Sequence, residues 1–584
     1  MLLSIACLSF FCIRSLSSTR QWPPPGAARK LDLEPHSPAP QVHDGSPDSS
    51  SSKKGPRGRF SLSSVVSARR PSFNEKFTRV VNSISGDMEF PALLQPVQGT
   101  GVDKLRAIGL RARKYKEYFE AWEELHLFLD EQGVGYVRDD VIQQIRHHFK
   151  KSLLDESVPG GLAETIRSYE ACRHLMAKLG QLLFPWTAPY FPSHTALHSH
   201  FKRSSRGIVL TAGDAGAPFL IPSIRSLRKL GCTLPIEIMY MGDSDLGEPN
   251  RAEFERLDGV TTRDFSRMVD DEGWKLSGWA AKPFAILFSS FRQVIFIDAD
   301  GLFFRNPERL FDDPGYIKTG ALFFKDRVIL PQSRKEWLQK MLPEPISQQV
   351  MQSRFWTGES GHVQDSGVVV VDKWRHFVAL LMVARMNGPD RYGDEGTTGV
   401  YDMVFGDKET FWLGWELVGD VDYAFHRGGV GTMGVVQEPE DEAESNKKPG
   451  SNEQVVLSGK DTAVVGTDER AGRGGLTERK RMESSTICAP QILHMDSDGR
   501  PLWFNGWVAG KKFADGDQRR FAKFEHFLVE PREVGETAFW QLRTGNICCL
   551  TAKSGVKGKF TLEEEETLNM IMRLAKGGNT TGEL

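Results

Sequence analysis

The stretch Arg292-Gln-Val-Ile-Phe-Ile-Asp-Ala-Asp-Gly-Leu-Phe-Phe304 decides the fold. Residues 294–297 are apolar and mostly β-branched, a pattern that predicts a strand buried on both faces, as in a parallel sheet. Asp298 and Asp300 follow at once, and because side chains alternate along a strand, both carboxylates point the same way. The sequence therefore predicts a carboxylate pair at the carboxyl end of a strand, where ligands bind in open α/β sheets.

Two neighbouring carboxylates repel each other, and a divalent cation would remove that repulsion. Hard oxygen ligands suit Mn²⁺ or Mg²⁺, so we expect Asp298 and Asp300 to hold Mn²⁺ (or Mg²⁺). A plain turn or helix cap at a strand end is the alternative. Two enzyme classes use this pattern: sugar-nucleotide glycosyltransferases of the GT-A type bind a metal–diphosphate with it, and phosphatases of the haloacid dehalogenase type use the first Asp as a nucleophile.

Composition narrows the choice of function. The chain has 584 residues, of which 40% are hydrophobic, so most of it should fold, and its formal charge of −2 argues against a nucleic-acid partner. Seven cysteines without a Cys-x-x-Cys pair make a disulfide scaffold or a zinc knuckle a poor interpretation. Buried thiols are one reading of these cysteines; the other pairs Cys172, Cys232 or Cys488 with Cys548 or Cys549.

Changes in composition divide the chain into segments. Residues 1–14 resemble a short signal or membrane anchor, and 15–90 are predicted to be a disordered stem rich in Ser, Pro, Gly and Arg. Residues 91–200 form a helical subdomain by their apolar spacing, and 201–545 form the catalytic α/β domain, interrupted by a disordered charged insert at 436–485. Residues 546–584 are a C-terminal helix and tail, with a capping box at Thr561-x-x-Glu564 and a stop at Gly577.

The α/β region opens with a strand at 207–213, a helix at 221–230 and a strand at 236–241, a unit that suits a parallel sheet. The loop after the first strand places Thr211 and Gly213 where a nucleotide could bind. A helix at 279–288 carries Lys282 near its start, either as a solvated surface group or as a cation directed at a diphosphate. Further strands are expected at 319–324, 365–372 and 487–494, with an aromatic and polar loop at 496–507.

In order and spacing, five segments resemble the fungal Golgi α-mannosyltransferases that build mannan outer chains, glycosyltransferase family 71: Gly207–Asp245, Trp279–Phe324, Ser366–Lys373, Gly406–Asp420 and Ile487–Trp507. The resemblance covers about residues 205–515 apart from the insert. It implies a GT-A fold, a GDP-mannose donor, Mn²⁺, a mannose-containing glycan on protein as acceptor, and a type II protein of the Golgi membrane with a luminal catalytic domain. The short apolar segment at the N-terminus departs from that pattern.

The resemblance also implies a third metal ligand. His494 is followed by Gly499-Arg-Pro-Leu-Trp503, which is similar to the His-then-Gly-x-x-Pro-Trp region of other retaining GT-A enzymes, where the His closes the metal site. A buried structural histidine is the alternative.

The acceptor side of the site is less specific. Trp412, Trp503 and Trp507 have the character of sugar-stacking platforms, although aromatic residues are more often core. An α-linked donor that gives an α-linked product means net retention, through a carboxylate nucleophile or a front-face attack. Candidates for the carboxylate are Asp365, Asp407 and Glu409.

Two other functions remain open. A haloacid-dehalogenase-like phosphatase would place its Asp-x-Asp on the first strand of its domain, whereas here a strand–helix–strand unit precedes it. A non-catalytic sugar-binding relative of the glycosyltransferase fold would keep the same site without transferring sugar.

Overall fold

A computed structural model describes residues 71–85, 90–129, 135–150, 161–187, 190–201, 206–393, 395–437, 484–510, 521–531, 538–543, 547–553 and 557–577. The predicted anchor, the stem up to residue 70 and most of the charged insert, 438–483, lie outside these residues.

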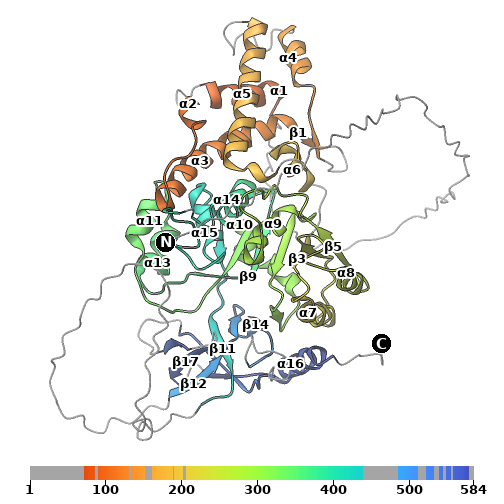
Figure 1. Cartoon of the computed structure of the whole chain (residues 1–584), viewed down its shortest axis with the longest axis vertical. Helices are drawn as coiled ribbons and strands as arrows, with labels where there is room; N and C mark the ends of the chain where they lie inside the picture. Colours follow the sequence, from red (N-terminus) through yellow and green to blue (C-terminus); the bar gives the residue numbers. More distant parts are fainter. Residues whose placement is uncertain are drawn as a thin grey trace, which may run out of the picture. The chain divides into compact units, whose positions relative to one another are not determined.

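The central sheet has seven strands in the order β10-β8-β9-β6-β3-β4-β5. Figure 1 labels three of them, β3, β5 and β9. Neighbouring strands are parallel except at β9, which is antiparallel to both β6 and β8. The predicted α/β fold with a mostly parallel sheet is thus confirmed. The strands are β3 (Arg206–Thr211), β4 (Ile236–Tyr240), β5 (Val260–Asp264), β6 (Gln293–Ile297), β8 (Ala321–Lys325), β9 (Gln364–Asp372) and β10 (Ala424–Phe425).

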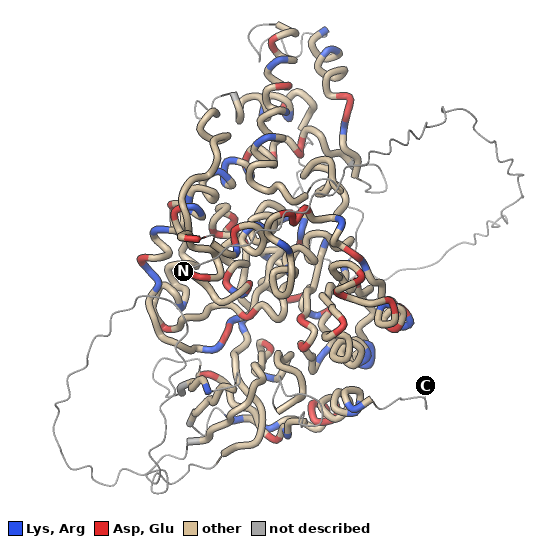
Figure 2. The backbone as a smooth tube through the Cα atoms, viewed as in Figure 1, with Lys and Arg blue, Asp and Glu red and all other residues tan. Residues whose placement is uncertain are grey.

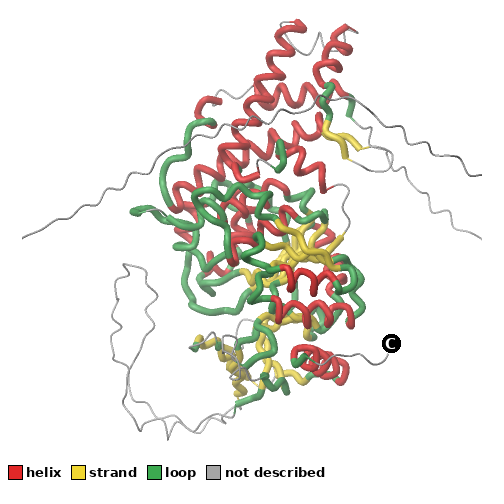
Figure 3. Tube along the Cα trace, turned by 45° about the vertical axis from the view of Figure 1, so that its right-hand side comes forward, coloured by secondary structure: helices red, strands yellow, loops and turns green. Residues whose placement is uncertain are grey.

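Helices cover both faces of this sheet; Figure 3 shows them in red and the strands in yellow. On one face, residues of α9 (Ala281–Phe288), α14 (Phe377–Asn387) and α15 (Thr410–Leu417) share a core with Val294 and Phe296. On the other, α7 (Ala217–Lys229) and α8 (Glu248–Glu255) pack against Ile295 and Ile297. Every residue of α9 and α14 is buried, as expected for helices that are apolar all round.

The N-terminal helical subdomain is present and begins earlier than predicted. Its elements are α1 (Phe73–Ser85), α2 (Phe90–Leu93), α3 (Gly101–His126), β1 (Leu127–Leu129), β2 (Gly135–Val137), α4 (Val141–Lys150), α5 (Gly161–Leu183) and α6 (His194–Phe201). Helix α1 lies in the segment assigned to the stem, yet Phe77, Val80 and Ile84 recur at helical spacing and are buried in the core that α3 and α5 share. The stem prediction is therefore wrong from Phe73 to Ser85.

Hydrogen bonds join the helical subdomain to the α/β core. The Arg113 guanidinium on α3 donates to the carbonyls of Glu416 and Leu417 at the end of α15, at 2.9 and 3.1 Å. These carbonyls belong to the last turn of the helix, where the regular helical hydrogen bonds run out, and the Glu416 carbonyl also accepts the Gly419 N–H at 3.1 Å. Within the described ranges, no helix is both long and apolar enough to span a membrane.

Short helices flank β8 in the sequence. Helix α10 (Pro314–Thr319) precedes the strand, and α11 (Lys335–Met341), α12 (Gln348–Met351) and α13 (Arg354–Thr357) follow it. Asp313 caps α10 by accepting hydrogen bonds from the backbone N–H groups of Gly315 and Tyr316.

A second sheet is antiparallel, in the order β18-β15-β11-β13-β14-β7. Its strands are β7 (Leu302–Phe303), β11 (Val430–Gly434), β13 (Ile492–Met495), β14 (Pro501–Asn505), β15 (His526–Val529) and β18 (Lys557–Lys559). Two predictions are wrong here. The strand expected at 487–494 is two strands, β12 (Ser484–Ala489) and β13, separated at Pro490, which has no backbone N–H to donate to a neighbouring strand. The loop expected at 496–507 contains the strand β14.

The C-terminal helix α16 (Leu562–Ala575) follows its sequence signals. Thr561 and Glu564 form the predicted capping box, and Gly577 has a φ of 78°, as a left-handed residue just beyond the helix end.

A disulfide joins Cys488 on β12 to Cys549 on β17 (Cys548–Lys553). Both strands belong to a three-stranded sheet, β12-β17-β16, with β16 at Ala538–Leu542. This is one of the pairings that the sequence left open. Cys172, Cys232 and Cys548 are free and buried.

Gly207 is required where the central strand β3 meets Phe291. A Cβ atom at residue 207 would lie 2.4 Å from the Phe291 ring, which is itself buried. We expect Gly207→Ala to lower the free energy of unfolding by about 1–3 kcal/mol through overpacking, measured by chemical denaturation. Combining it with Phe291→Leu should give a smaller loss than the sum of the two single changes, and strict additivity would contradict the contact.

Candidate active site

Asp298 and Asp300 lie just beyond β6 in a tight turn. The Asp298 N–H donates to the Gly367 carbonyl on β9 at 2.8 Å, and the Gly301 N–H donates to the Asp298 carbonyl at 2.9 Å. The Asp300 carbonyl accepts from the Trp507 N–H at 3.2 Å. Backbone contacts to β9 and to the segment after β14 therefore fix the turn that carries both carboxylates.

The two carboxylates line a pocket of about 550 Å³ at the carboxyl ends of β3, β4 and β6. This is where the sheet topology predicts ligand binding. The pocket brings together all five residues predicted to bind the donor: Thr211, Gly213, Lys282, Asp298 and Asp300. The lining also includes Met241, Ser244, Asp245, Phe265, Leu276, Ser277 and Trp279, to which the sequence analysis gave no role.

Asp245 shapes the β3 end of the pocket. Its carboxylate accepts the Met241 N–H at 2.9 Å, and its backbone carbonyl accepts the Asp214 N–H at 2.8 Å. A Cβ atom at Gly213 would lie 2.6 Å from an Asp245 carboxylate oxygen. Glycine at position 213 thus allows this close approach of the two loops, and its role in binding the donor stays a prediction.

Lys282 is the cation at the centre of the site. Its Nζ lies 2.9 Å from the Asp298 carboxylate, 3.2 Å from Asp407 Oδ2 and 3.2 Å from Ser366 Oγ. Ser366 Oγ in turn donates to Asp407 Oδ2 at 2.7 Å. The solvated-surface reading of Lys282 is excluded by these contacts, since its side chain is only 7% exposed.

Burial and charge act against each other in this cluster. Burial raises the pKa of Asp298 to about 7; Lys282 opposes the rise, and the Asp300 and Asp407 carboxylates add to it. Burial alone would lower the pKa of Lys282, but its ion pairs with Asp298 and Asp407 outweigh burial and raise it. The cluster has more carboxylates than cations, which is the electrostatic condition for binding a further cation.

Asp365 and His494 form a separate pair. His494 Nε2 donates to Asp365 Oδ2 at 3.0 Å, and the His494 ring stacks on Trp503 with centroids 4.1 Å apart. Asp365 precedes Ser366 on β9, and successive side chains on a strand point to opposite faces, so this pair and Lys282 contact opposite faces of β9. Burial would raise the pKa of Asp365, but the hydrogen bond from His494 and the charge of Lys408 hold it well below its usual range.

His494 is not gathered with Asp298 and Asp300 into a three-ligand site. Among the residues with described positions, no group of three or more His, Cys, Asp and Glu side chains could hold a metal ion. The contacts of His494 are those of the alternative interpretation, a buried structural histidine, because its side chain is 2% exposed and its Nε2 bonds to Asp365.

The Glu409 carboxylate is buried and hydrogen-bonded. It accepts the Trp412 Nε1–H at 2.6 Å and the Val363 N–H at 2.8 Å. Burial raises its pKa to about 7. Of the three carboxylates considered for catalysis, Asp407 is the one that forms an ion pair with a residue lining the pocket, Lys282.

The three tryptophans predicted to stack on sugar have no exposed ring. Trp412 is 1% exposed, Trp503 is fully buried, and Trp507 is 4% exposed with its ring edge-on to Phe219. A pyranose needs an accessible ring face, so their burial in this structure fits a packing role. The exposed aromatic at the pocket is Trp279, at 62%, and the signal that could have identified it is its position three residues before Lys282.

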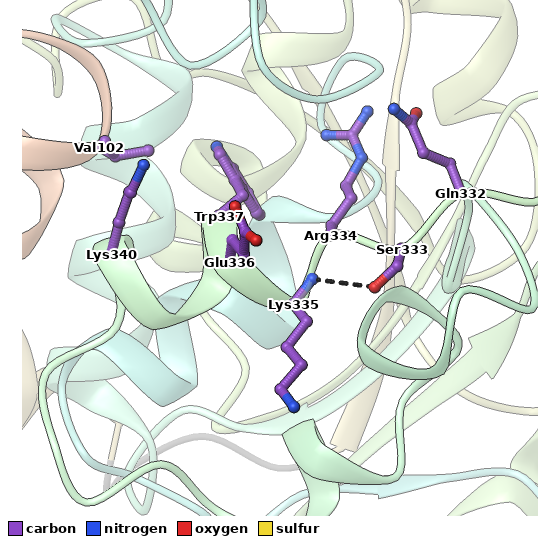
Figure 4. A pocket seen from close by; sticks show the side chains of 8 residues that line it. All are labelled: Val102, Gln332, Ser333, Arg334, Lys335, Glu336, Trp337 and Lys340. Atoms are coloured by element: carbon purple, nitrogen blue, oxygen red, sulfur yellow. Dashed lines mark hydrogen bonds between the residues drawn. The ribbon is translucent and has the colours of Figure 1, made fainter. Parts of the chain in front are cut away.

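A second hollow, of about 640 Å³, lies around α11 (Figure 4). It is lined by Val102, Gln332, Ser333, Arg334, Lys335, Glu336, Trp337 and Lys340. None of the carboxylates of the Lys282 cluster borders it. Elsewhere along the described chain, Lys and Arg are interspersed with Asp and Glu, as Figure 2 shows, in keeping with the formal charge of −2.

Comparison with known proteins identifies the family. Residues 205–496, half of the chain, match the family described as "Mannosyltransferase putative", and the chain belongs to that family. The predicted resemblance to fungal mannosyltransferases is thereby confirmed.

Two relatives illustrate the similarity. "Putative alpha-1,3-mannosyltransferase MNN14" of Candida albicans is 29% identical over 327 residues, covering 52% of this chain and 42% of that protein. "Alpha-1,3-mannosyltransferase MNT3" of Saccharomyces cerevisiae is 25% identical over 359 residues, covering 56% and 50%. The chain therefore spans about half the length of the curated relatives it matches.

Solved structures give only distant matches. The glycosyltransferase GlyE of Streptococcus pneumoniae matches 38% of this chain and 45% of its own at 12% identity, with a TM-score of 0.24. The galactosyltransferase LgtC, in complex with donor and acceptor sugar analogues, matches 38% and 73% at 14% identity, also with a TM-score of 0.24.

Lys282 should be required for stability as well as for binding. We expect Lys282→Met to lower the free energy of unfolding by about 3–5 kcal/mol, because it leaves buried carboxylates without their cation. Urea denaturation measures the loss. The matched control is Lys340→Met, an exposed lysine of the same chain, which should change stability by less than about 0.5 kcal/mol. Equal effects of the two changes would contradict the buried-cluster interpretation.

Proposed function

We propose that the chain transfers mannose from GDP-mannose to a mannose-containing glycan on protein, with retention of the anomeric configuration and with Mn²⁺ (or Mg²⁺) bound at Asp298 and Asp300. The observation that carries the proposal is the Lys282 cluster: in a chain that belongs to a mannosyltransferase family, two strand-end carboxylates and a buried lysine line one pocket. Because the Asp-x-Asp follows β6 and not the first strand of the sheet, the site also favours a GT-A-type transferase over a phosphatase.

The residues present fit a divalent cation. The cluster holds a carboxylate whose pKa is raised to about 7, in part by two neighbouring carboxylates, and hard oxygen atoms are the ligands that Mn²⁺ and Mg²⁺ accept. Such cations often bind through one or two carboxylates together with substrate phosphates, so a third protein ligand is not required. When bound, the cation would supply Lewis-acid stabilisation of the diphosphate leaving group. A role for His494 as a further ligand stays a prediction.

The chain's own residues have separate tasks in this proposal. Thr211, Gly213 and Asp245 form the part of the pocket that would receive the nucleotide, at the ends of β3 and β4. Lys282 provides a fixed positive charge for the departing diphosphate, and it is held in place before the reaction, so no reorganisation is needed. Asp407 and Ser366 are positioning residues, because they contact Lys282 and direct its ammonium group towards Asp298.

Retention is compatible with this set of groups. Asp407 is the carboxylate nearest to the pocket by its contact with Lys282, yet that ion pair occupies it. Asp365 is bonded to His494, and Glu409 is bonded to Trp412. With all three carboxylates engaged, the proposal favours a front-face attack by the acceptor hydroxyl, in which the departing phosphate oxygen accepts the proton.

The proposed location is the Golgi membrane, with the catalytic domain in the lumen. The Cys488–Cys549 disulfide supports it, since disulfides persist in the oxidising secretory pathway and are rare in the cytosol.

Asp298→Asn and Asp300→Asn should each lower the rate of mannose transfer by about 10³-fold or more, because each removes an anionic ligand and its electrostatic contribution. The assay is release of GDP from GDP-mannose with Mn²⁺ and an α-mannoside acceptor. Electron paramagnetic resonance of Mn²⁺ should show weaker binding in both variants. Asp312→Asn, an exposed aspartate, is the control.

Full transfer by either variant with intact folding would refute the proposed site. If the wild-type protein binds GDP-mannose but transfers nothing to any mannoside, the non-catalytic alternative is correct.

Protein expressed through a secretory pathway should contain a peptide pair linked by Cys488 and Cys549, detectable by non-reducing peptide mapping. Loss of the bond in Cys488→Ala is expected to lower the free energy of unfolding by about 2–4 kcal/mol. Cys172→Ala, at a free cysteine, serves as the comparison for the loss of a buried thiol alone. Two free thiols at 488 and 549 in secreted protein would contradict both the bond and the luminal location.

A further inference from the structure

Two exposed aromatic side chains meet at the edge of the pocket. Trp279, in the 3-10 helix η2 (Gly278–Ala280), is 62% exposed, and Phe405 is 58% exposed; their ring centroids lie 6.3 Å apart at an interplanar angle of 35°. Trp279 lines the pocket itself. We call this pair the Trp279–Phe405 platform.

We propose that the Trp279–Phe405 platform binds a pyranose ring of the acceptor glycan; this inference rests on the proposed mannosyltransferase function. One face of a pyranose carries axial C–H groups and is apolar, so it packs on an aromatic ring, while its hydroxyl groups stay hydrated or bond to polar groups at the ring edge. An exposed Trp and Phe in contact offer such a surface with little conformational entropy to lose.

The position of the platform fits an acceptor. A Cβ atom at Gly406 would lie 3.2 Å from Trp279 Cε3, so Trp279 lies over the backbone of residue 406. The next residue, Asp407, forms the ion pair with Lys282 at 3.2 Å. The platform therefore lies next to the residue that pairs with Lys282, on the side of the pocket where the diphosphate would bind. An acceptor must approach the donor sugar close to this diphosphate, so the platform has a suitable position for binding it.

Gly406 has a further reason to be glycine. Its φ is +61°, in the left-handed region, and its lack of a side chain lets the Trp279 ring approach the backbone. The Trp279 ring thus packs against the backbone of Gly406 and against the Phe405 ring. These two contacts restrict its orientation, although the side chain stays 62% exposed.

A polar group stands next to the platform. The His362 ring is edge-on to Phe405, with centroids 5.9 Å apart, and its Nδ1 has no hydrogen-bond partner among the residues that the structure describes. Burial lowers the pKa of His362, which favours its neutral form. A polar ring beside an apolar surface is the kind of group that fixes a ligand's orientation.

Binding measurements on the full chain test the platform without requiring turnover. The probes are α-linked mannobiose and, separately, GDP, each followed by saturation-transfer NMR. We expect Trp279→Ala and Phe405→Ala to weaken mannobiose binding by about tenfold or more, with the dissociation constant for GDP in Phe405→Ala staying within about twofold of wild type. Trp279→Phe should restore most of the mannobiose binding, because it keeps an aromatic face.

The control is Tyr190→Ala. Tyr190 is 52% exposed and contacts Phe191, which stacks on Phe288 at the opposite end of α9 from Lys282, so its loss should leave mannobiose binding unchanged. In steady-state transfer, the expected signature of the platform variants is a raised KM for the acceptor and a kcat close to wild type at saturating acceptor.

Three results would overturn the inference: no mannobiose binding by the wild-type protein, undiminished binding in both platform variants, or equal weakening of mannobiose and GDP, which would assign the aromatics to the donor. The test separates this inference from the proposed function. Mannobiose bound through the platform without any transfer from GDP-mannose would refute the function alone, and transfer with unaffected variants would refute the platform alone.

Discussion

The ion pair between Lys282 and Asp298 is the constraint on which the rest of the site depends. Both groups are largely buried, and an unpaired charge in such a place would cost several kcal/mol. Asp407 and Ser366 complete the set, so the cation and its acceptors come from α9, from the turn after β6, from β9 and from the residues just before α15. These four segments must dock together before all the charges of the cluster are paired.

The antiparallel strand β9 divides the polar groups of the domain into two networks. Ser366 belongs to the network of Lys282, while the preceding Asp365 bonds to His494 on β13. A register shift in the pairing of β8 with β9 accompanies this change of environment at the start of β9. At this irregular start of β9, one face of the strand therefore contributes Ser366 to the Lys282 cluster, and the other face contributes the hydrogen-bonded pair of Asp365 and His494.

The antiparallel sheet holds the turn of the Asp pair in place. Its strand β7 directly follows that turn and pairs with β14, and the Trp507 N–H bonds to the Asp300 carbonyl. Gly367 makes this close packing possible, because a Cβ atom there would lie 2.7 Å from Asn505 Nδ2. His494 on β13 and Trp503 on β14 stack on each other in the core behind the site, whereas Trp279 and Phe405 are exposed at the edge of the pocket.

The sequence by itself determined the α/β class, the position of the Asp pair, the loop at Thr211 and Gly213 that lines the same pocket, and the cap of α16. These features follow from local rules, namely strand alternation, apolar runs and capping, which act over a few residues. Tertiary structure decided the rest. It made helix α1 part of the core, paired Cys488 with Cys549, turned β9 antiparallel and directed His494 to Asp365. It also buried Trp412, Trp503 and Trp507 while exposing Trp279. Which way a side chain faces, and which distant group it meets, depends on docking between segments that lie far apart in the sequence: Cys488 and Cys549 are 61 residues apart, and Asp365 and His494 are 129 residues apart. No local pattern in the chain encodes that.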